Sequence, residues 1–249
     1  MSTACKIETA ISRQEWVRET RFGRWFLSTN IWFRHVLGEA VLDFSRLLGA
    51  DHPAMNRLLD AGCGIGAAFS LLEHYFQPDV IVGVDIDREL IEIAATSALQ
   101  CQSQVILESS SVVDLDFPDQ SFDMIFCHQF LHHTADQKGA LQRFYRLLTP
   151  GGVVLVGESC RPFIRSLPVR LLFKHPVEAQ KSAVEFIDLV KSMGFEVGEH
   201  DVKISTPWWS RWDLGLSEKL GIAGKKTLQA TEVLIVARKP ALAQRSQKA

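Results

Sequence analysis

The chain has 249 residues, of which 47% are hydrophobic and 22% are charged; this composition suits one large folded domain and excludes a mostly disordered protein. The formal net charge of −2 lacks the basic excess typical of nucleic-acid-binding proteins, so we expect no nucleic-acid partner. The five cysteines are scattered without a CxxC pair, which favours a reducing compartment over a disulfide framework or a zinc knuckle.

Targeting and membrane-spanning segments are not expected from the sequence. The first twenty residues are rich in charged side chains and contain no apolar core of signal-peptide length. No apolar run approaches the ~20 residues that a transmembrane helix needs. We therefore predict a cytoplasmic protein.

The first fifth of the chain is rich in large apolar residues at helical spacing. Gly23 and residues 28–30 interrupt the pattern, and Ser28 or Asn30 is the expected helix N-cap. We expect two or three helices here and assign residues 1–50 to an N-terminal helical cap. The sequence leaves open whether this cap closes over a ligand or packs on the edge of a sheet.

Short apolar strands alternate with helical stretches in the rest of the chain. Strands are expected at 57–62, 80–86, 104–110, 122–129, 151–159, near 195–205 and at 230–239, and helices at 67–76, 88–100, 138–148 and 182–194. Continuous β-branched runs are typical of strands buried on both faces, so we predict a doubly wound α/β fold. We assign residues 51–240 to this domain, with a lid-like insertion near 160–180 and a flexible tail at 241–249.

The stretch LLDAGCGIG (58–66) places three glycines on alternate positions directly after the first expected strand. A glycine costs roughly 0.5–1 kcal/mol relative to alanine inside a regular element, so three together indicate that something approaches the backbone closely. Ligands of open parallel sheets bind outside the carboxyl ends of the strands, where this loop lies. Asp85 ends the second expected strand, 19 residues after Gly66, and a carboxylate there can accept hydrogen bonds from both hydroxyls of a ribose.

Two cofactors are compatible with a glycine loop followed by an acid. Residues 62–67 fit the dinucleotide pattern G-x-G-x-x-A, which makes NAD an alternative. Asp60 disfavours NAD, because a carboxylate repels a pyrophosphate but attracts a cationic ligand. The expected ligand carries ribose and a positive charge but no phosphate, as S-adenosylmethionine does. Asp60 and Asp85 could instead cap the loops or helices that follow them.

Several motifs together resemble the class I S-adenosylmethionine-dependent methyltransferases. The matching stretches, in family order, are LLDAGCGIG (58–66), VGVDID (82–87), 114–133, RLLTPGGVVLVGES (146–159) and the late strand ATEVLIVARK (230–239). The chain is most similar to the small-molecule type 11 group, of the ubiquinone and menaquinone biosynthesis type. The resemblance implies a Rossmann-like, seven-stranded, mostly parallel sheet with an antiparallel last strand.

The resemblance also implies a set of cofactor-binding residues. The glycine loop would lie along the amino acid portion of S-adenosylmethionine, Asp60 would orient that loop or bind the ammonium through water, and Asp85 would bind the ribose. Ser111 and Val112 stand where relatives carry an acidic and a small residue beside the adenine. The full set is Asp60, Ala61, Gly62, Cys63, Gly64, Gly66, Asp85, Ile86, Ser111, Val112, Cys127 and His128.

Histidines follow the fourth expected strand. A histidine there can act as a general base, because its ordinary pKa near 6.5 suits deprotonation of an acidic hydroxyl. We name His132 and His133 as the candidate catalytic residues, with a capping or packing role as the alternative. His128 and His132 are four residues apart, but the spacing places no third ligand, so we expect no metal. Methyl transfer needs mainly in-line positioning, because the sulfonium is already an activated electrophile.

The acceptor is expected to contact the N-terminal helices and residues 161–216. Residues 161–175 contain four cations and no acid among apolar side chains, which suits an anionic amphiphile, a peripheral membrane contact or an ordinary solvated loop. Residues 206–216 contain three tryptophans within five positions, which suits an aromatic substrate wall or a core plug. We predict a methyltransferase acting on a small, apolar or aromatic molecule. The alternatives are a non-catalytic S-adenosylmethionine-binding regulatory protein and an NAD-dependent oxidoreductase; the oligomeric state is not predicted.

Overall fold

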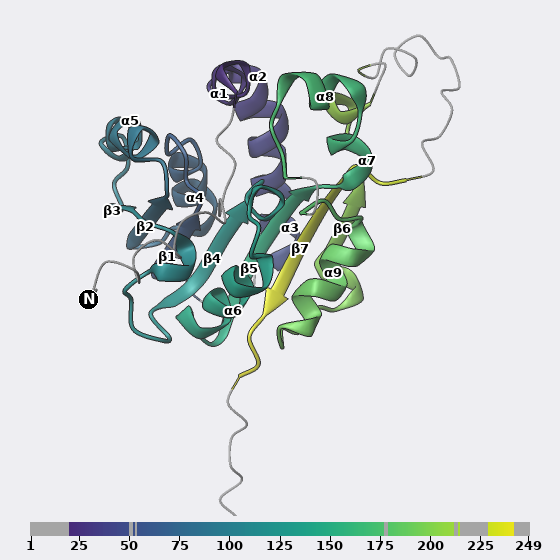
Figure 1. Ribbon diagram of the computed structural model, residues 1–249. Coiled ribbons are helices and arrows are strands. Elements are labelled where there is room, and N and C mark those ends of the chain that lie inside the picture. The colour runs from purple at the N-terminus through teal and green to yellow at the C-terminus, as the bar shows by residue number, and fades with distance from the viewer. Residues whose placement is uncertain are drawn as a thin grey trace, which may run out of the picture.

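One mixed sheet forms the centre of the computed structural model, which describes residues 20–49, 52, 54–176, 179–211, 214 and 229–241. Its strands are β1 (Arg57–Ala61), β2 (Val80–Asp85), β3 (Gln104–Ser109), β4 (Phe122–His128), β5 (Leu148–Ser159), β6 (Val202–Ser205) and β7 (Glu232–Arg238). The order is β3-β2-β1-β4-β5-β7-β6, and β7 runs antiparallel to both β5 and β6, whereas β1 to β5 pair in parallel. The seven-stranded sheet with its antiparallel last strand confirms the predicted fold (Figure 1).

Helices cover both faces of the sheet. They are α1 (Arg21–Leu27), α2 (Asn30–Trp32), α3 (Glu39–Leu48), α4 (Phe69–Phe76), α5 (Arg88–Ala98), α6 (Gln137–Leu147), α7 (Arg161–Ile164), α8 (Leu167–Leu172) and α9 (Ala183–Ser192). A π-helical segment, η2 (Phe33–Gly38), links α2 to α3, and single 3-10 turns occur at η3 (Val112–Asp114), η4 (Leu131–His133), η5 (Glu199–Asp201) and η6 (Trp208–Ser210). Among the described helices, none is long and apolar enough to cross a membrane.

The core consists of two apolar clusters, one on each face of the sheet. Phe144 of α6 and Phe186 of α9 are fully buried on one face, and Phe44 of α3 and Phe69 of α4 are fully buried on the other. The central strands alternate between the two clusters, as Leu58 and Leu59 on β1 do. This burial on both faces is the physical reason for the continuous apolar runs in the sequence.

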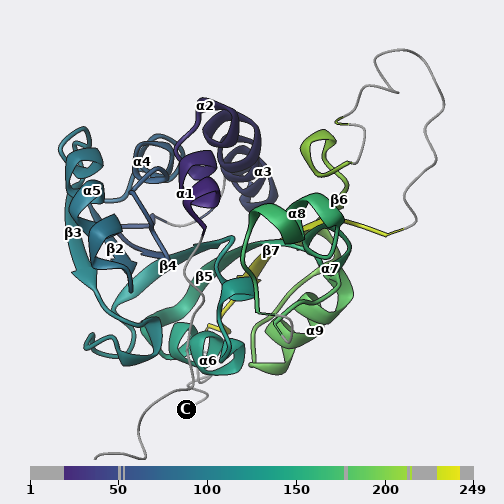
Figure 2. The ribbon, with the colours of Figure 1, turned by 45° about the horizontal axis from the view of Figure 1, so that its top comes forward.

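The N-terminal helices divide between the core and the open end of the sheet. Helix α3 packs on the sheet, where Phe44 stacks edge-on against Phe126 of β4 at 6.0 Å between ring centroids. Helix α1 lies instead beyond the carboxyl ends of the strands, near α8 (Figure 2). Phe22 and Phe26 of α1 contact Phe173, which directly follows α8, at 5.7 and 5.9 Å between ring centroids. The assignment of residues 1–50 to a separate cap remains a prediction.

Two local expectations at the N-terminus are wrong. Gly23 is buried inside α1 and is not a break. Thr29, rather than Ser28 or Asn30, is the N-cap of α2, because its hydroxyl accepts a hydrogen bond from the Trp32 amide at 3.3 Å. Residues 1–19, the tail from 242 onward and Trp212 of the tryptophan-rich stretch lie outside the described residues.

Candidate active site

The glycine loop after β1 is held against the end of β2. The amides of Gly62 and Cys63 both donate to the Val84 carbonyl, at 2.8 and 2.9 Å. Gly62, Gly64 and Gly66 have φ values of +79°, +54° and +73°, which residues with a Cβ adopt only at a cost. The sequence therefore needs glycine here for its backbone conformation alone.

The three glycines differ in what surrounds them. A Cβ on Gly62 would meet the Phe130 ring at 2.6 Å, and one on Gly66 would meet the Phe69 ring at 2.5 Å. These two glycines permit close packing of the loop against protein. A Cβ on Gly64 would meet no protein atom within 4 Å, and Gly64 lines a large pocket. Gly64 therefore leaves room for a ligand.

Asp85 connects the two parts of the site. Its Oδ2 accepts from the Gly64 amide and its Oδ1 accepts from the Asp87 amide, both at 2.9 Å. Burial raises the pKa of Asp85, while these backbone hydrogen bonds oppose the rise. Each carboxylate oxygen retains a lone pair for a further hydrogen bond. The fixed carboxylate can thus accept from a pair of ligand hydroxyls.

The pocket beside Asp85 has a volume of about 660 Å³, within the range of small-molecule sites. Of the residues predicted from sequence, the pocket is lined by Gly62, Cys63, Gly64, Asp85, Ile86, Ser111, Val112, His128 and His133. The remaining predicted residues that do not line it are Asp60, Ala61, Gly66, Cys127 and His132. The structure therefore gathers most of the predicted set, from the ends of β1, β2 and β4 and from η3, around one space.

Two of the residues outside the lining are buried beneath it. Asp60 is only 2% exposed, and burial together with the charge of Asp85 raises its pKa to about 8. Cys127 is fully buried in the core, and burial raises the pKa of its thiol well above the usual value. The Cys127 side chain therefore packs in the core rather than facing the pocket.

Three buried polar atoms at the carboxyl ends of β1 and β4 have no hydrogen-bond partner among the described residues: Asp60 Oδ2, His128 Nε2 and Gln129 Nε2. Gln129 also has a φ of +54°, which is unusual for a residue with a Cβ. Buried polar groups are normally paired, so such a group of orphaned atoms indicates a ligand. The set offers donors and acceptors, as the ammonium and carboxylate of an amino acid require.

The turn after β4 is held by a buried acid that the sequence analysis did not identify. Glu158 of β5 is fully buried, and its carboxylate accepts from the amides of Phe130, Leu131 and His132 at 2.7–3.3 Å. Its Oε2 lies 2.5 Å from Nδ1 of His132. The only sequence signal was an acid at the end of an otherwise apolar strand. Glu158 thus fixes both the turn and the His132 ring.

Two glutamines complete this turn. Gln137 Nε2 donates to the carbonyls of Leu131 and Ala179, at 2.7 and 2.8 Å. Gln180 Nε2 donates to the His132 carbonyl at 3.1 Å. The backbone between β4 and α6 is therefore positioned by three buried polar side chains, of which Glu158 and Gln180 come from distant parts of the chain.

A third histidine joins His132 and His133. His175, in the segment after α8, has its ring centroid 5.1 Å from that of His132 and 4.7 Å from that of His133. One ring nitrogen of each residue lies within 4.8 Å of the others, a set able to hold a metal ion. Sequence spacing could not place this third ring. Burial is the largest cause that lowers the pKa of His133 and, to about 3, that of His175, so both rings are neutral near pH 7.

Other pocket residues were also missed. Arg24, Leu27 and Trp32, from the N-terminal helices, line the same pocket as Gly64 and Asp85. Their positions depend on how α1 crosses the end of the sheet, which no local pattern reveals. Trp208 and Trp209 of the tryptophan-rich stretch, in contrast, line neither this pocket nor the pocket beside Gln180: Trp208 contacts His35, and Trp209 contacts Phe163.

Comparison with known proteins decides the family. Residues 59–156 match the family model described as "Methyltransferase domain", of the type 11 group. The chain contains a class I S-adenosylmethionine-dependent methyltransferase domain. S-adenosylmethionine is the cofactor of this family.

Curated relatives of the methyltransferase domain are named for different methyl acceptors. Phosphoethanolamine N-methyltransferase 3 of Arabidopsis thaliana is 34% identical over 105 residues, which cover 42% of this chain and 21% of that protein. Demethylmenaquinone methyltransferase of Symbiobacterium thermophilum is 30% identical over 44% of this chain and 45% of that protein. The chain spans only 21 to 27% of the length of the phosphoethanolamine N-methyltransferases that it matches.

Solved structures share the fold of the methyltransferase domain. The [4+2]-cyclase SpnF aligns with a TM-score of 0.61 and 21% identity, over 83% of this chain and 80% of that one. YcgJ of Bacillus subtilis aligns with a TM-score of 0.58 and 20% identity, over 82% of this chain and all of that one. One of these neighbours is described as a cyclase, so the fold by itself does not fix the reaction.

Proposed function

We propose that this protein transfers a methyl group from S-adenosylmethionine to a small acceptor with an apolar or aromatic body. The observation that carries the proposal is the 660 Å³ pocket in which Gly64 leaves space beside a fixed Asp85. Asp60 lies near the end of β1, beside the loop where a dinucleotide would place its pyrophosphate, and its raised pKa means that it gains a negative charge only beside a cation. This favours a cationic cofactor over NAD.

The residues present fit S-adenosylmethionine along its length. Asp85 would accept from the ribose hydroxyls, and Ile86 and Val112 would pack on the adenine. The orphaned atoms of Asp60, His128 and Gln129 would serve the amino acid end. When bound, the cofactor supplies a methyl group already activated by its sulfonium.

The protein's own contribution is to orient the acceptor and exclude water. Leu27 and Trp32 line the pocket from the N-terminal helices, which suits an apolar or aromatic acceptor and shields the site from water. His133 lines the pocket and is neutral near pH 7, so its ring can form a hydrogen bond with an acceptor hydroxyl or amine, although its lowered pKa makes it a weak base. His132, fixed by Glu158, is a positioning residue for this turn.

The test is transfer of isotopically labelled methyl groups from S-adenosylmethionine to the low-molecular-mass fraction of a cell extract. The wild-type protein is expected to label one small molecule, and Asp85→Ala is expected to label none. Binding of the cofactor without any labelling would contradict catalysis and would favour the non-catalytic regulatory alternative. A cytoplasmic location remains a prediction from the sequence.

A further inference from the structure

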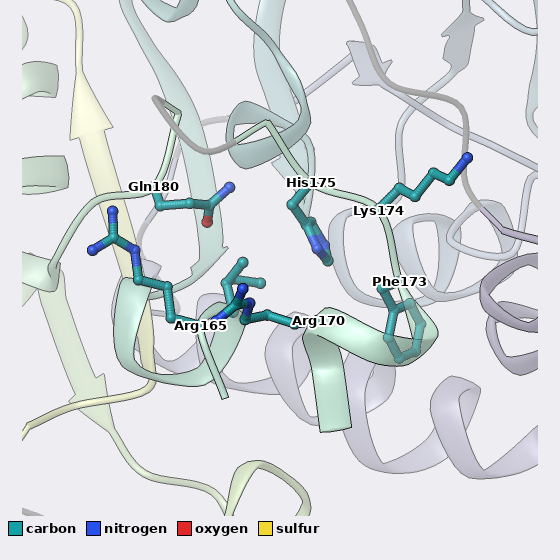
Figure 3. A pocket seen from close by; sticks show the side chains of 7 residues that line it. Arg165, Arg170, Phe173, Lys174, His175 and Gln180 are labelled. Carbon is teal, nitrogen blue, oxygen red and sulfur yellow. The ribbon is translucent and has the colours of Figure 1, made fainter. Parts of the chain in front are cut away.

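A second pocket lies next to the cofactor pocket. It has a volume of about 710 Å³ and is lined by Ile164, Arg165, Arg170, Phe173, Lys174, His175 and Gln180. These residues belong to α7, α8 and the segment after α8, which is the region where the sequence predicted a lid-like insertion. Figure 3 shows Gln180 and His175 pointing into the space above Arg170, with Arg165 beside Gln180 and Lys174 directed away from His175.

Among the residues that the structure describes, no acid balances the charge in this second pocket. Arg165, Arg170 and Lys174 form no ion pair with any described residue, and none of the residues that line the pocket is acidic. Arg161, only four residues before Arg165, is by contrast bound to both carboxylate oxygens of Glu185 at 2.6 and 2.7 Å. Unpaired cations that line one concave space attract an anion, and arginine pairs well with carboxylate and phosphate.

Gln180 adds a second requirement for the ligand. It is only 5% exposed, and its Nε2 donates to the carbonyls of His132 and Pro176 at 3.1 and 2.9 Å. Because both partners are acceptors, the orientation of the amide is fixed. Its Oε1 is buried without a partner among the described residues. The pocket therefore presents an unmet acceptor, which a hydroxyl or amine of a ligand would satisfy.

The two pockets share a wall. His133 lines the cofactor pocket and His175 lines the second pocket, and their ring centroids are 4.7 Å apart. Phe173 of the second pocket packs on Phe22 of α1 at 5.7 Å, and α1 provides Arg24 to the cofactor pocket. A small molecule seated in the second pocket would thus lie beside the part of the cofactor pocket that His133 lines.

We propose that the second pocket is the anion subsite for the methyl acceptor, so that the acceptor is a small molecule with an oxyanion, carboxylate or phosphate, and a hydroxyl or amine donor. The oxyanion pairs with Arg165 and Arg170, and the donor meets Gln180 Oε1. This inference rests on the proposed methyl transfer and adds a class of acceptor to it.

A lipid headgroup is the other source of the same anionic chemistry. Leu167 and Leu171 of α8 are 71% and 74% exposed and lie beside Arg170 in the sequence. These features are typical of a helix that touches a membrane surface. The buried Gln180 acceptor favours a small molecule instead, because a headgroup held at a surface does not reach a side chain that is only 5% exposed. The experiment therefore includes both sources.

Calorimetry with a matched pair of ligands tests the proposal. The probes are 6-hydroxynaphthalene-2-carboxylate and its uncharged carboxamide, each titrated into protein saturated with S-adenosylhomocysteine. The carboxylate is expected to bind about tenfold more tightly than the amide, as charge-assisted hydrogen bonds to arginine would give. The double variant Arg165→Gln/Arg170→Gln is expected to lose this preference. The control double variant Arg88→Gln/Lys191→Gln removes the same amount of charge from exposed residues on α5 and α9. It is expected to retain the preference for the carboxylate over the carboxamide.

The outcomes separate the inference from the proposed function. If S-adenosylhomocysteine does not bind, the proposed function fails. If it binds but the wild type does not distinguish the two probes, or if both double variants behave alike, the anion subsite is wrong. Phosphatidylglycerol vesicles provide the last arm: binding to vesicles that depends on Arg165 and Arg170, without a preference for the soluble carboxylate, would overturn the proposal in favour of a membrane contact.

Discussion

Glu158 and His132 form a buried pair, with Oε2 of Glu158 2.5 Å from Nδ1 of His132. The same carboxylate accepts from three consecutive backbone amides of the turn after β4. One side chain from β5 therefore fixes the turn that carries His133 into the cofactor pocket. A carboxylate in this role orients the ring of a histidine and the backbone around it at once.

Replacing Glu158 with Gln should destabilise the protein, because an amide cannot accept all of these hydrogen bonds and introduces unmatched donors. We expect the free energy of unfolding to fall by about 2–4 kcal/mol, measured by urea denaturation. Glu73→Gln is the control, since Glu73 also accepts from two backbone amides but lies at the surface. An equal loss in both variants would contradict the structural role assigned to Glu158.

Gly64→Ala tests whether the open space at this loop belongs to a ligand. The left-handed backbone costs a residue with a Cβ about 1 kcal/mol, and the same cost applies to Gly151→Ala, where φ is +81° and a Cβ also meets nothing within 4 Å. We expect both variants to lose similar stability in denaturation experiments. Only Gly64→Ala should weaken binding of S-adenosylhomocysteine, because only its new methyl group enters the pocket.

Asp60 should release a proton when a cationic cofactor binds. Its pKa is raised to about 8 by burial and by the charge of Asp85, so it is mainly protonated at pH 7. A nearby ammonium and sulfonium would lower that pKa and expel the proton into the buffer. Calorimetry of S-adenosylmethionine binding at pH 7 in buffers of different ionisation enthalpy measures this release. We expect release in the wild type and none in Asp60→Asn; equal values for the two would show that Asp60 does not sense the cofactor.

The buried His128 and the half-buried His175 should make stability fall with acid. Burial, and then the charge of His132, lowers the pKa of both His128 and His175 to about 3, below the ordinary 6.5. A group with a lowered folded pKa and a higher unfolded one binds more protons when unfolded, so its contribution is present above pH 6.5 and is lost as pH falls toward 3. The slope is up to about 1.4 kcal/mol per pH unit for each such ring.

Urea denaturation between pH 5 and 6.5 separates this effect from that of the surface carboxylates, which titrate mainly below that window. We expect His175→Gln to reduce the pH dependence there, and His200→Gln, which alters an exposed ring, to leave it unchanged. Asp60 gives stability the opposite pH dependence. Because its pKa is raised in the folded protein, its contribution to the free energy of unfolding declines as pH rises toward 8. An unchanged slope in His175→Gln would contradict the lowered pKa of that ring.

The parts of the site that could be predicted from sequence are those that are local in the chain. The glycine loop and Asp85 occur at fixed places after two neighbouring parallel strands, so strand recognition alone brings Gly64 and Asp85 together. In the structure, β1 and β2 pair with Asp60 opposite Gly83, so the loop after β1 lies beside the end of β2. The burial of every central strand likewise follows from continuous apolar runs.

The rest depends on contacts between distant segments, which no spacing encodes. Glu158 reaches the turn after β4 because β4 and β5 pair with His128 opposite Gly157. Gln180 and His175 reach the same turn from a segment more than 40 residues further along the chain. The composition of residues 161–175 indicated an anionic ligand or membrane, but only the pocket shows which cations share a space.

The most direct test of the central claim is calorimetric titration of the wild-type protein with S-adenosylhomocysteine and, separately, with NAD. We predict binding of S-adenosylhomocysteine only, weakened at least about tenfold by Asp85→Ala, which is about 1.4 kcal/mol. Asp116→Ala, an exposed acid after η3, should leave the affinity unchanged. Binding of NAD, or no binding of S-adenosylhomocysteine to the wild type, would contradict the account.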